Sequence, residues 1–351
     1  MMSRIRLITA ASFAGSLGWG TILPFQYAYV VDTRHWGATV GILTGTAFCV
    51  GAVVAAPIAG RMADRHPAGR LAVLFTLAAA AACIGLGSAS APGQFLAAIA
   101  VFGAAVTAVG PTTQVLVLDC IDPQERRAAF AYQFTALALG MAAGAFVSGL
   151  LIDLESPTGM WPAFLTAAAG FSVSAALLRL AAGWSARTPS ALTDSRTERI
   201  TDELSGLATY RQLARNRQIR LLAFVSMALA AGFYAQFETG LPAFALQELA
   251  VDARTVGIAA AANCLVIVAL QWLVTKLTGR SHAAGLLIVV AAIWVGSWLL
   301  LEAALFVDSS RAGLLFVVAF MTFAVGETMY APILSPLAAA VAPPGLVGTT
   351  L

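Results

Sequence analysis

Ten long apolar runs limit what this 351-residue chain can fold into. A helix needs about 20 mostly apolar residues to cross the hydrocarbon core of a bilayer. Runs of that length occupy residues 5–31, 39–60, 71–90, 93–118, 128–152, 161–184, 218–247, 254–275, 283–306 and 312–338. Only 11% of the residues are charged, against roughly a quarter in a soluble domain. The sequence therefore predicts an all-α membrane protein with ten transmembrane helices.

One long polar segment, residues 185–217, separates the sixth run from the seventh. It divides the chain into a predicted N-terminal six-helix bundle (1–184) and a C-terminal bundle of four helices (218–351). Within the segment, apolar side chains recur every three residues at Leu204, Leu207, Tyr210 and Leu213, with acidic residues before them and arginines after. We expect a cytoplasmic linker with a short amphipathic helix on the membrane face. A disordered tether is the alternative.

The basic residues predict which way the chain crosses the membrane. All but three of the 20 Lys and Arg residues fall on one side of the predicted topology, and the exceptions are Arg34, Arg254 and Arg311. Because basic residues resist translocation, the crowded side is expected to be cytoplasmic. The N-terminus, the charged stretch 60–70 and the linker would then all lie inside the cell.

Several classes of function are excluded at this stage. Neither a Ser/His/Asp constellation, nor a carboxylate pair, nor a phosphate-binding glycine loop is present in the sequence, so we expect neither an enzyme nor ATP-driven transport. The net charge of +3 and the absence of a basic stripe argue against nucleic acid as a partner. The cysteines (Cys49, Cys83, Cys120 and Cys264) are far apart in or beside apolar runs, so we expect packing residues and no metal or other cofactor.

Proline recurs in every third apolar run, at Pro24, Pro111, Pro242, and then Pro332 with Pro336. A proline in a spanning helix frees backbone carbonyls, which is tolerated where the helix faces protein or a watery cavity. The other runs are interpreted as helices that support these proline-containing helices by packing. Among them, Gly140 and Gly144 have the spacing that lets two helices approach closely.

Polar side chains follow the same period of three helices. The candidates for substrate or proton binding are Gln26, Tyr27, Gln114, Tyr234, Gln236, Glu238, Glu327 and Tyr330. The coincidence with proline predicts a central cavity lined by the first, fourth, seventh and tenth helices, built from three-helix repeats. Taken singly, each of these side chains could instead be an ordinary interhelical hydrogen-bonding group.

The charged stretch 60–70 carries a motif. Its residues Gly60, Ala63, Asp64, Arg65, Gly69 and Arg70 match the signature that major facilitator superfamily transporters carry between their second and third helices, with two extra residues before Gly69. Asp119, Pro123, Glu125 and Arg126 resemble the family's loop after the fourth helix. The whole chain resembles this family, in particular its bacterial drug-efflux members. The resemblance implies a two-bundle fold and a cytoplasmic gate in which Asp64, Arg65, Asp119 and Arg126 clamp helix ends together.

The sequence departs from the family pattern at positions that concern proton coupling and the cytoplasmic gate. Ile99 stands four residues before Gly103, where efflux members often have arginine, and Ala145 follows Gly144 in place of proline. The loop with Lys276, Gly279 and Arg280 has no aspartate. The chain ends at 343–351, where an eleventh helix would begin. We expect a truncated sequence that lacks the last two helices and the partner against which Asp64 docks, and a naturally short ten-helix form is the alternative.

Glu327 is the strongest candidate for chemistry, since it lies near the middle of the run 312–338. We expect it to bind the coupling proton or a cationic substrate, with Tyr330 on the same helix face. Glu238 is expected nearer the outer mouth.

The predicted function is proton-coupled efflux of a hydrophobic or amphipathic small molecule by a monomer in the bacterial plasma membrane. A small-metabolite importer of the same fold and a non-transporting membrane scaffold are the alternatives.

Overall fold

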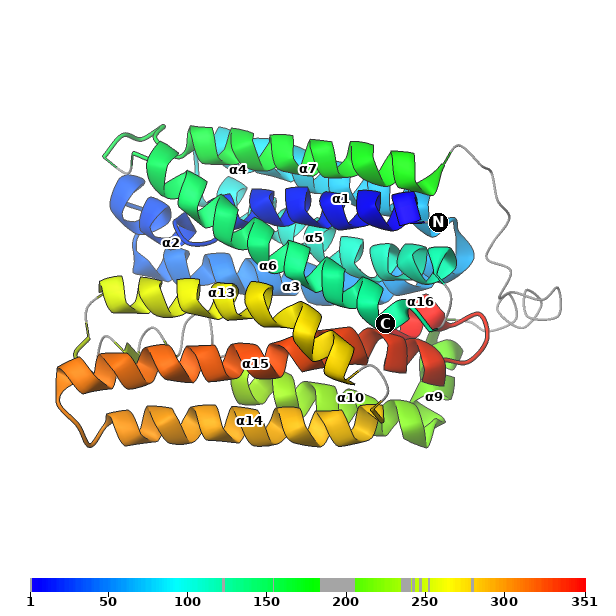
Figure 1. Cartoon of the computed structure of the whole chain (residues 1–351). Coiled ribbons are helices and arrows are strands. Elements are labelled where there is room, and N and C mark those ends of the chain that lie inside the picture. Colours follow the sequence, from blue (N-terminus) through cyan, green and yellow to red (C-terminus); the bar gives the residue numbers. More distant parts are fainter. Residues whose placement is uncertain are drawn as a thin grey trace. The chain divides into compact units, whose positions relative to one another are not determined.

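The computed structural model describes residues 2–121, 124–153, 155–183, 206–234, 241, 244–245, 248–251, 253–278 and 281–351. Every regular element in these ranges is helical. Nine helices among them are long and apolar enough to cross a membrane, which confirms the all-α membrane class (Figure 1). The predicted run 218–247 is described only in part and is not one of the nine. Glu238, Gln236 and Pro242 lie outside the described residues, as does linker residue Leu204.

Contacts divide the chain into two compact units. The first comprises Met1–Ala129, Ala136–Ser205 and Ala342–Leu351, and the second Phe130–Thr135 and Gly206–Val341. The first contains α1 (Met2–Ile22), α2 (Gln26–Ala28), the π-helical turn η1 (Tyr29–Thr33), α3 (Ala38–Arg65), α4 (Ala68–Ser88), α5 (Pro92–Cys120), most of α6 (Arg126–Leu151), α7 (Trp161–Ala182) and α16 (Val347–Thr350). The second contains α9 (Gly206–Arg215), α10 (Arg217–Leu229), the π-helical turn η2 (Ala230–Tyr234), α13 (Ala253–Thr278), α14 (Ala283–Ala304) and α15 (Ser309–Val341).

Two helix ends differ from the prediction, each beside a proline. The predicted helix 5–31 is interrupted after Ile22, because Pro24 has no N–H to donate and its ring obstructs the preceding turn. Conversely, α3 continues past residue 60 to Arg65, so Asp64 is helical and the connection to α4 shrinks to His66 and Pro67. His66 is extended (φ −127°, ψ 157°), as expected of a residue before proline.

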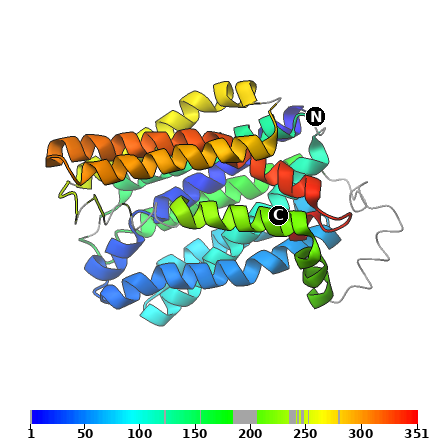
Figure 2. The same cartoon turned by 90° about the horizontal axis from the view of Figure 1, so that it is seen from below.

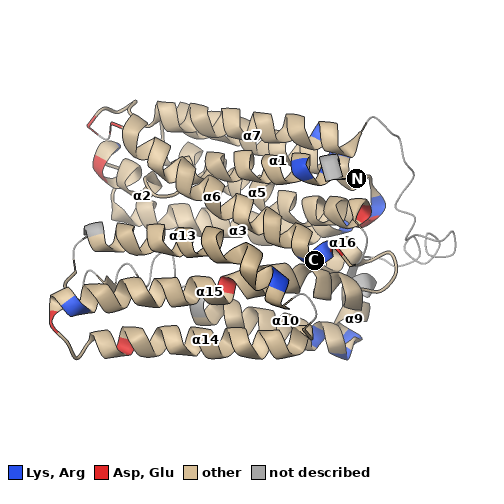
Figure 3. Ribbon diagram, viewed as in Figure 1, with Lys and Arg blue, Asp and Glu red and all other residues tan. Residues whose placement is uncertain are grey.

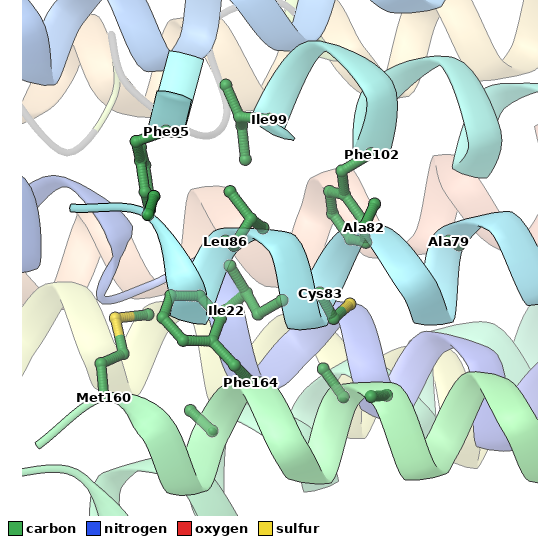
Figure 4. Packing of buried hydrophobic residues seen from close by; sticks show 14 of the residues in the cluster. Ile22, Ala79, Ala82, Cys83, Leu86, Phe95, Ile99, Phe102, Met160 and Phe164 are labelled. Carbon is green, nitrogen blue, oxygen red and sulfur yellow. The ribbon is translucent and has the colours of Figure 1, made fainter. Parts of the chain in front are cut away.

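The core of the first unit forms where α4, α5 and α7 meet (Figure 4). Phe95, Phe102 and Phe164 are fully buried there, beside small residues of α4 such as Cys83. Small side chains let membrane helices approach closely. The same holds between α1 and α6, where a Cβ on Gly140 or Gly144 would overlap the backbone of α1. The predicted close helix approach at Gly140 and Gly144 is therefore confirmed.

Arg34 follows η1, at the end of the first unit away from most of its basic residues. Its guanidinium lies 4.5 Å from the ring centroid of Trp36 and donates hydrogen bonds to the Tyr29 hydroxyl (3.1 Å) and the Ser90 carbonyl (3.3 Å). Arg34 thus ties the turn before α3 to the turn before α5. This structural use accounts for one of the three exceptions to the basic-residue asymmetry.

In the second unit, α13, α14 and α15 lie side by side (Figures 1 and 2). Phe316, Phe320 and Phe323 of α15 are buried together with Trp294 of α14. Ser297 donates a hydrogen bond to the Ala319 carbonyl (2.8 Å), and the Trp294 indole donates to that of Phe323 (3.2 Å). The face of α15 that carries Glu327 is therefore held by buried contacts.

Charged residues gather at the helix ends within each unit (Figure 3). In the second unit, the basic residues of α9, the start of α10 and the end of α13 lie at one end, and Glu302, Asp308 and Arg311 lie at the other. The helix surfaces between these ends carry few charges. Such a distribution is expected when the apolar middle of the helices lies in the hydrocarbon core of a bilayer.

Candidate functional site

Asp64 lies in the last turn of α3 and accepts three hydrogen bonds from the C-terminal residues of the same unit. Its carboxylate accepts the backbone N–H groups of Gly348 (2.5 Å) and Thr349 (2.7 Å) and the Thr349 hydroxyl (2.5 Å). These donors belong to the first turn of α16, where a helix leaves its N–H groups without internal partners. A carboxylate there also meets the positive end of the helix dipole. Asp64 therefore caps α16.

This contact corrects one expectation from the sequence. Asp64 was expected to lack a docking partner in this chain, but residues 347–350 supply it. A single turn suffices, because only the first N–H groups of a helix are free to be capped. The prediction failed because it relied on long apolar runs to identify helices, and the segment after Pro343 and Pro344 is too short to meet that criterion.

Gly60 lets α3 approach α16 closely enough for this capping. A Cβ on Gly60 would stand 2.6 Å from the Gly348 carbonyl oxygen, and one on Gly348 would stand 2.5 Å from that of Gly60. The two backbones therefore touch, one helical turn before Asp64. Gly69, in the first turn of α4, is close-packed in the same way, since its Cβ would lie 2.5 Å from that of Ala182.

Gly60→Ala is expected to lower stability by about 1–3 kcal/mol and to separate α16 from Asp64, because the added methyl meets backbone that cannot rotate away. The measurement is thermal unfolding of the purified protein in detergent. Gly45→Ala is the matched control, since Gly45 is an exposed glycine of the same helix with nothing within 4 Å of the added Cβ. Equal unfolding temperatures for the two variants would contradict the close approach.

The other predicted gate residues lie near these helix ends. Arg65 and Arg70 are exposed on α3 and α4, and Asp119 is exposed near the end of α5. Arg126 begins α6 half-buried, and its Nε is buried without a hydrogen-bond partner among the described residues. Their joint action as an ionic clamp remains a prediction, whereas the hydrogen bonds of Asp64 go to α16.

Glu327 is buried on α15 and has a partner that the sequence analysis missed. Its carboxylate accepts a hydrogen bond from the Asn263 side chain of α13 (3.1 Å), and the same amide nitrogen donates to the Phe320 carbonyl (3.3 Å). Glu327 is 6% exposed and Asn263 is 4% exposed. Asn263 follows the alanines at 259–262, in the run 254–275, which the sequence analysis assigned to support. Its polar side chain in an apolar run was the one signal that could have identified it.

Tyr330 shares the buried face of α15 with Glu327 but has different neighbours. Its ring centroid lies 5.4 Å from that of Trp294. Both residues are buried on α15, and their joint role in binding remains a prediction. In the second unit, α15 and α13 thus have three buried polar side chains, those of Glu327, Tyr330 and Asn263.

Gln271 is a second polar residue of α13 that the sequence analysis missed. Pro332 has no N–H, so the carbonyl four residues earlier, that of Thr328, loses its helical donor. The Gln271 side-chain nitrogen donates to this carbonyl at 2.9 Å and to the Thr275 hydroxyl at 3.2 Å. Gln271 is 2% exposed. It therefore satisfies the backbone group that the proline of the neighbouring helix frees.

Gln271→Leu is expected to cost about 1–3 kcal/mol of stability, because the Thr328 carbonyl is then buried without a donor. In the background Pro332→Ala the same substitution is expected to cost less, since residue 332 regains an N–H that can reach the Thr328 carbonyl. Unfolding of the four proteins in a double-mutant cycle measures the difference. Additive effects of the two substitutions would refute the pairing.

The remaining candidates lie apart from Glu327 in the sequence and on other elements. Gln26 and Tyr27 form part of the short α2, and the Tyr27 ring packs against Gly41 of α3. Gln114 is half-buried on α5, next to Thr113, whose hydroxyl is buried without a hydrogen-bond partner in the described part of the chain. Tyr234 ends η2. Their role in binding remains a prediction.

Comparison with known proteins identifies the class. The Major Facilitator Superfamily profile matches residues 8–351, so the chain belongs to this family of membrane transporters. No curated protein sequence matches it. The human organic anion transporter MFSD10 (TETRAN) is similar in structure, with a TM-score of 0.67, 19% identity, and coverage of 99% of this chain and 87% of that one.

A second solved structure shows the same fold. The peptide transporter POT, crystallised as a point mutant in complex with sulfate, has a TM-score of 0.64 and 14% identity, covering 99% of this chain and 86% of that one. At these identities the likeness concerns the fold alone. The chain is therefore a multi-pass membrane protein of a transporter family, with a small molecule as its cargo.

Proposed function

We propose that this chain is a monomeric secondary transporter of the plasma membrane that works by alternating access and exports a hydrophobic or amphipathic small molecule in exchange for protons. The observation that carries the proposal is Glu327, a buried carboxyl group in an apolar spanning helix. An ionisable group at membrane depth is costly and marks an ion or substrate pathway in most cases. Asn263 donates to one carboxylate oxygen, Oε2, and a carboxylate can accept several hydrogen bonds, so a proton or a cation can still bind.

The charge of Glu327 favours neutral and cationic substrates. An ionised carboxylate in a low-dielectric site repels an organic anion and attracts a cation. The helix that carries Glu327 has few other charged side chains, which suits an apolar or amphipathic ligand held by few polar contacts. We therefore place lipophilic cations first among the substrates, unlike the organic anions named for MFSD10.

Asp64 supplies the proposed gate. With the N-terminus inside the cell, as the basic residues favour, the contact of α3 with α16 lies on the cytoplasmic side. Its hydrogen bonds stabilise the state in which these helix ends are joined. Breaking them would be part of opening toward the cytoplasm.

Transport by purified protein in liposomes tests the function. With an acidic lumen, an antiporter is expected to drive ethidium into the lumen as protons leave, and DNA enclosed in the liposomes reports its arrival by fluorescence. Ethidium carries a permanent charge, so it does not follow the pH gradient by itself. Liposomes without protein are the control. Depletion of ethidium from the lumen would indicate the importer alternative, and an uptake rate independent of the gradient would reject proton coupling.

A further inference from the structure

A basic cluster lies where the second unit's α9 meets α10. It consists of Arg211, Arg215, Arg217 and Arg220, all four exposed. No acidic residue occurs between Gly206 and Leu229, and none of the four arginines forms an ion pair within the described part of the chain. Four positive charges therefore lie within ten residues without a neutralising partner there.

The backbone at this junction is fixed. The Asn216 side chain caps α10 by accepting the N–H groups of Gln218 (2.9 Å) and Ile219 (3.4 Å). On α9, Leu213 is buried at 6% exposure, and Arg211 and Arg215 project from the opposite face, one turn apart. The arginines are thus presented on an ordered turn and not on a free tail.

The neighbouring apolar surface indicates what these arginines face. Leu221, Phe224 and Met227 are 53%, 64% and 66% exposed and form one stripe along α10. Arg217 precedes Leu221 by four residues and Arg220 precedes Phe224 by four, so both arginines continue that stripe at its N-terminal end. A large apolar stripe is stable in contact with acyl chains, and arginines at its end then lie at headgroup depth.

We propose that these four arginines bind the headgroups of anionic phospholipids, with Arg217 and Arg220 in direct contact with the lipid phosphate. Arginine forms paired hydrogen bonds with phosphate oxygens, and clustered basic residues beside a spanning helix attract acidic lipids. The bound lipids would anchor the junction of α9 and α10 in the membrane surface. The proposal does not depend on the substrate or on proton coupling.

Native mass spectrometry of the full-length protein tests this site with phosphatidylglycerol and phosphatidylcholine of matched acyl chains. The wild type is expected to retain phosphatidylglycerol preferentially. Arg217→Gln with Arg220→Gln is expected to weaken this retention about 30-fold, whereas Arg311→Gln, at the other end of the second unit, leaves it unchanged. Inorganic phosphate is expected not to displace the lipid, because it lacks the acyl chains.

Three outcomes would overturn the proposal: equal retention of the two lipids by the wild type, undiminished retention by the double variant, or displacement by inorganic phosphate. Should the double variant not fold, as judged by size-exclusion chromatography, the single substitutions Arg217→Gln and Arg220→Gln take its place. Each is expected to weaken retention about fivefold, and wild-type retention by both would also refute the site.

Discussion

Asp64→Asn is expected to lower transport about 10- to 100-fold while leaving a folded protein in the membrane. The carboxylate accepts hydrogen bonds with both oxygens, from the two N–H groups of α16 and the Thr349 hydroxyl. An amide offers one acceptor oxygen and turns its NH₂ toward donors, so at least one N–H group of α16 loses its partner. The negative charge at the positive end of α16 is lost as well. Ethidium transport in liposomes is the measurement.

Two controls separate gating from general damage. Thr349→Val removes one hydroxyl donor and keeps both N–H contacts, so a smaller loss of transport is expected. Asp308→Asn removes an exposed carboxylate whose ion pair with Arg311 is open to solvent, and transport should not change. Full activity of Asp64→Asn, measured at equal protein levels, would refute the gating role.

Glu327→Gln is expected to abolish the response of transport to a pH gradient. Glutamine keeps an oxygen that can accept the Asn263 hydrogen bond, so the helices stay packed, but it cannot gain or lose a proton. The ratio of ethidium uptake with and without the gradient is expected to fall to about 1, the value for zero coupling. Downhill exchange is expected to lose its dependence on pH for the same reason.

Glu302→Gln is the matched control for this substitution. Glu302 is an exposed carboxyl group near the end of α14, and its replacement should leave the gradient response intact. A gradient response of Glu327→Gln equal to that of the wild type would show that Glu327 is a structural residue. The proposal of proton coupling through this residue would then be withdrawn, and the family assignment would be unaffected.

The class of fold was predictable because apolar length alone specifies spanning helices. Helix ends were harder to predict, since they depend on local chemistry. Pro24 interrupts a run that is long and apolar enough to span a membrane, and α3 continues through charged residues to Arg65. Hydropathy identifies where the hydrocarbon core begins and not where the backbone stops being helical.

In each contact at the candidate sites, the sequence predicted one of the interacting residues but not its partner. Asp64 and Glu327 stood out as a motif residue and as an intramembrane acid. Their partners, Gly348 with Thr349 and Asn263, are 284, 285 and 64 residues distant in sequence. Helical periodicity relates residues three or four apart and carries no information on such distances. Gln271 shows the same limit, because its role depends on a proline in another helix.

The hydrogen bonds that α13 donates to the backbone of α15 have a mechanical consequence. The Asn263 and Gln271 side chains donate hydrogen bonds to the carbonyls of Phe320 and Thr328, which are two turns apart on α15. If one helix slid or tilted against the other, these polar groups would lose their hydrogen-bond partners in an apolar medium. We therefore expect α13 and α15 to move together as one rigid body. A motion that exposes Glu327 first to one side of the membrane and then to the other would move Asn263 with it, so the carboxylate would keep the same neighbour throughout the cycle.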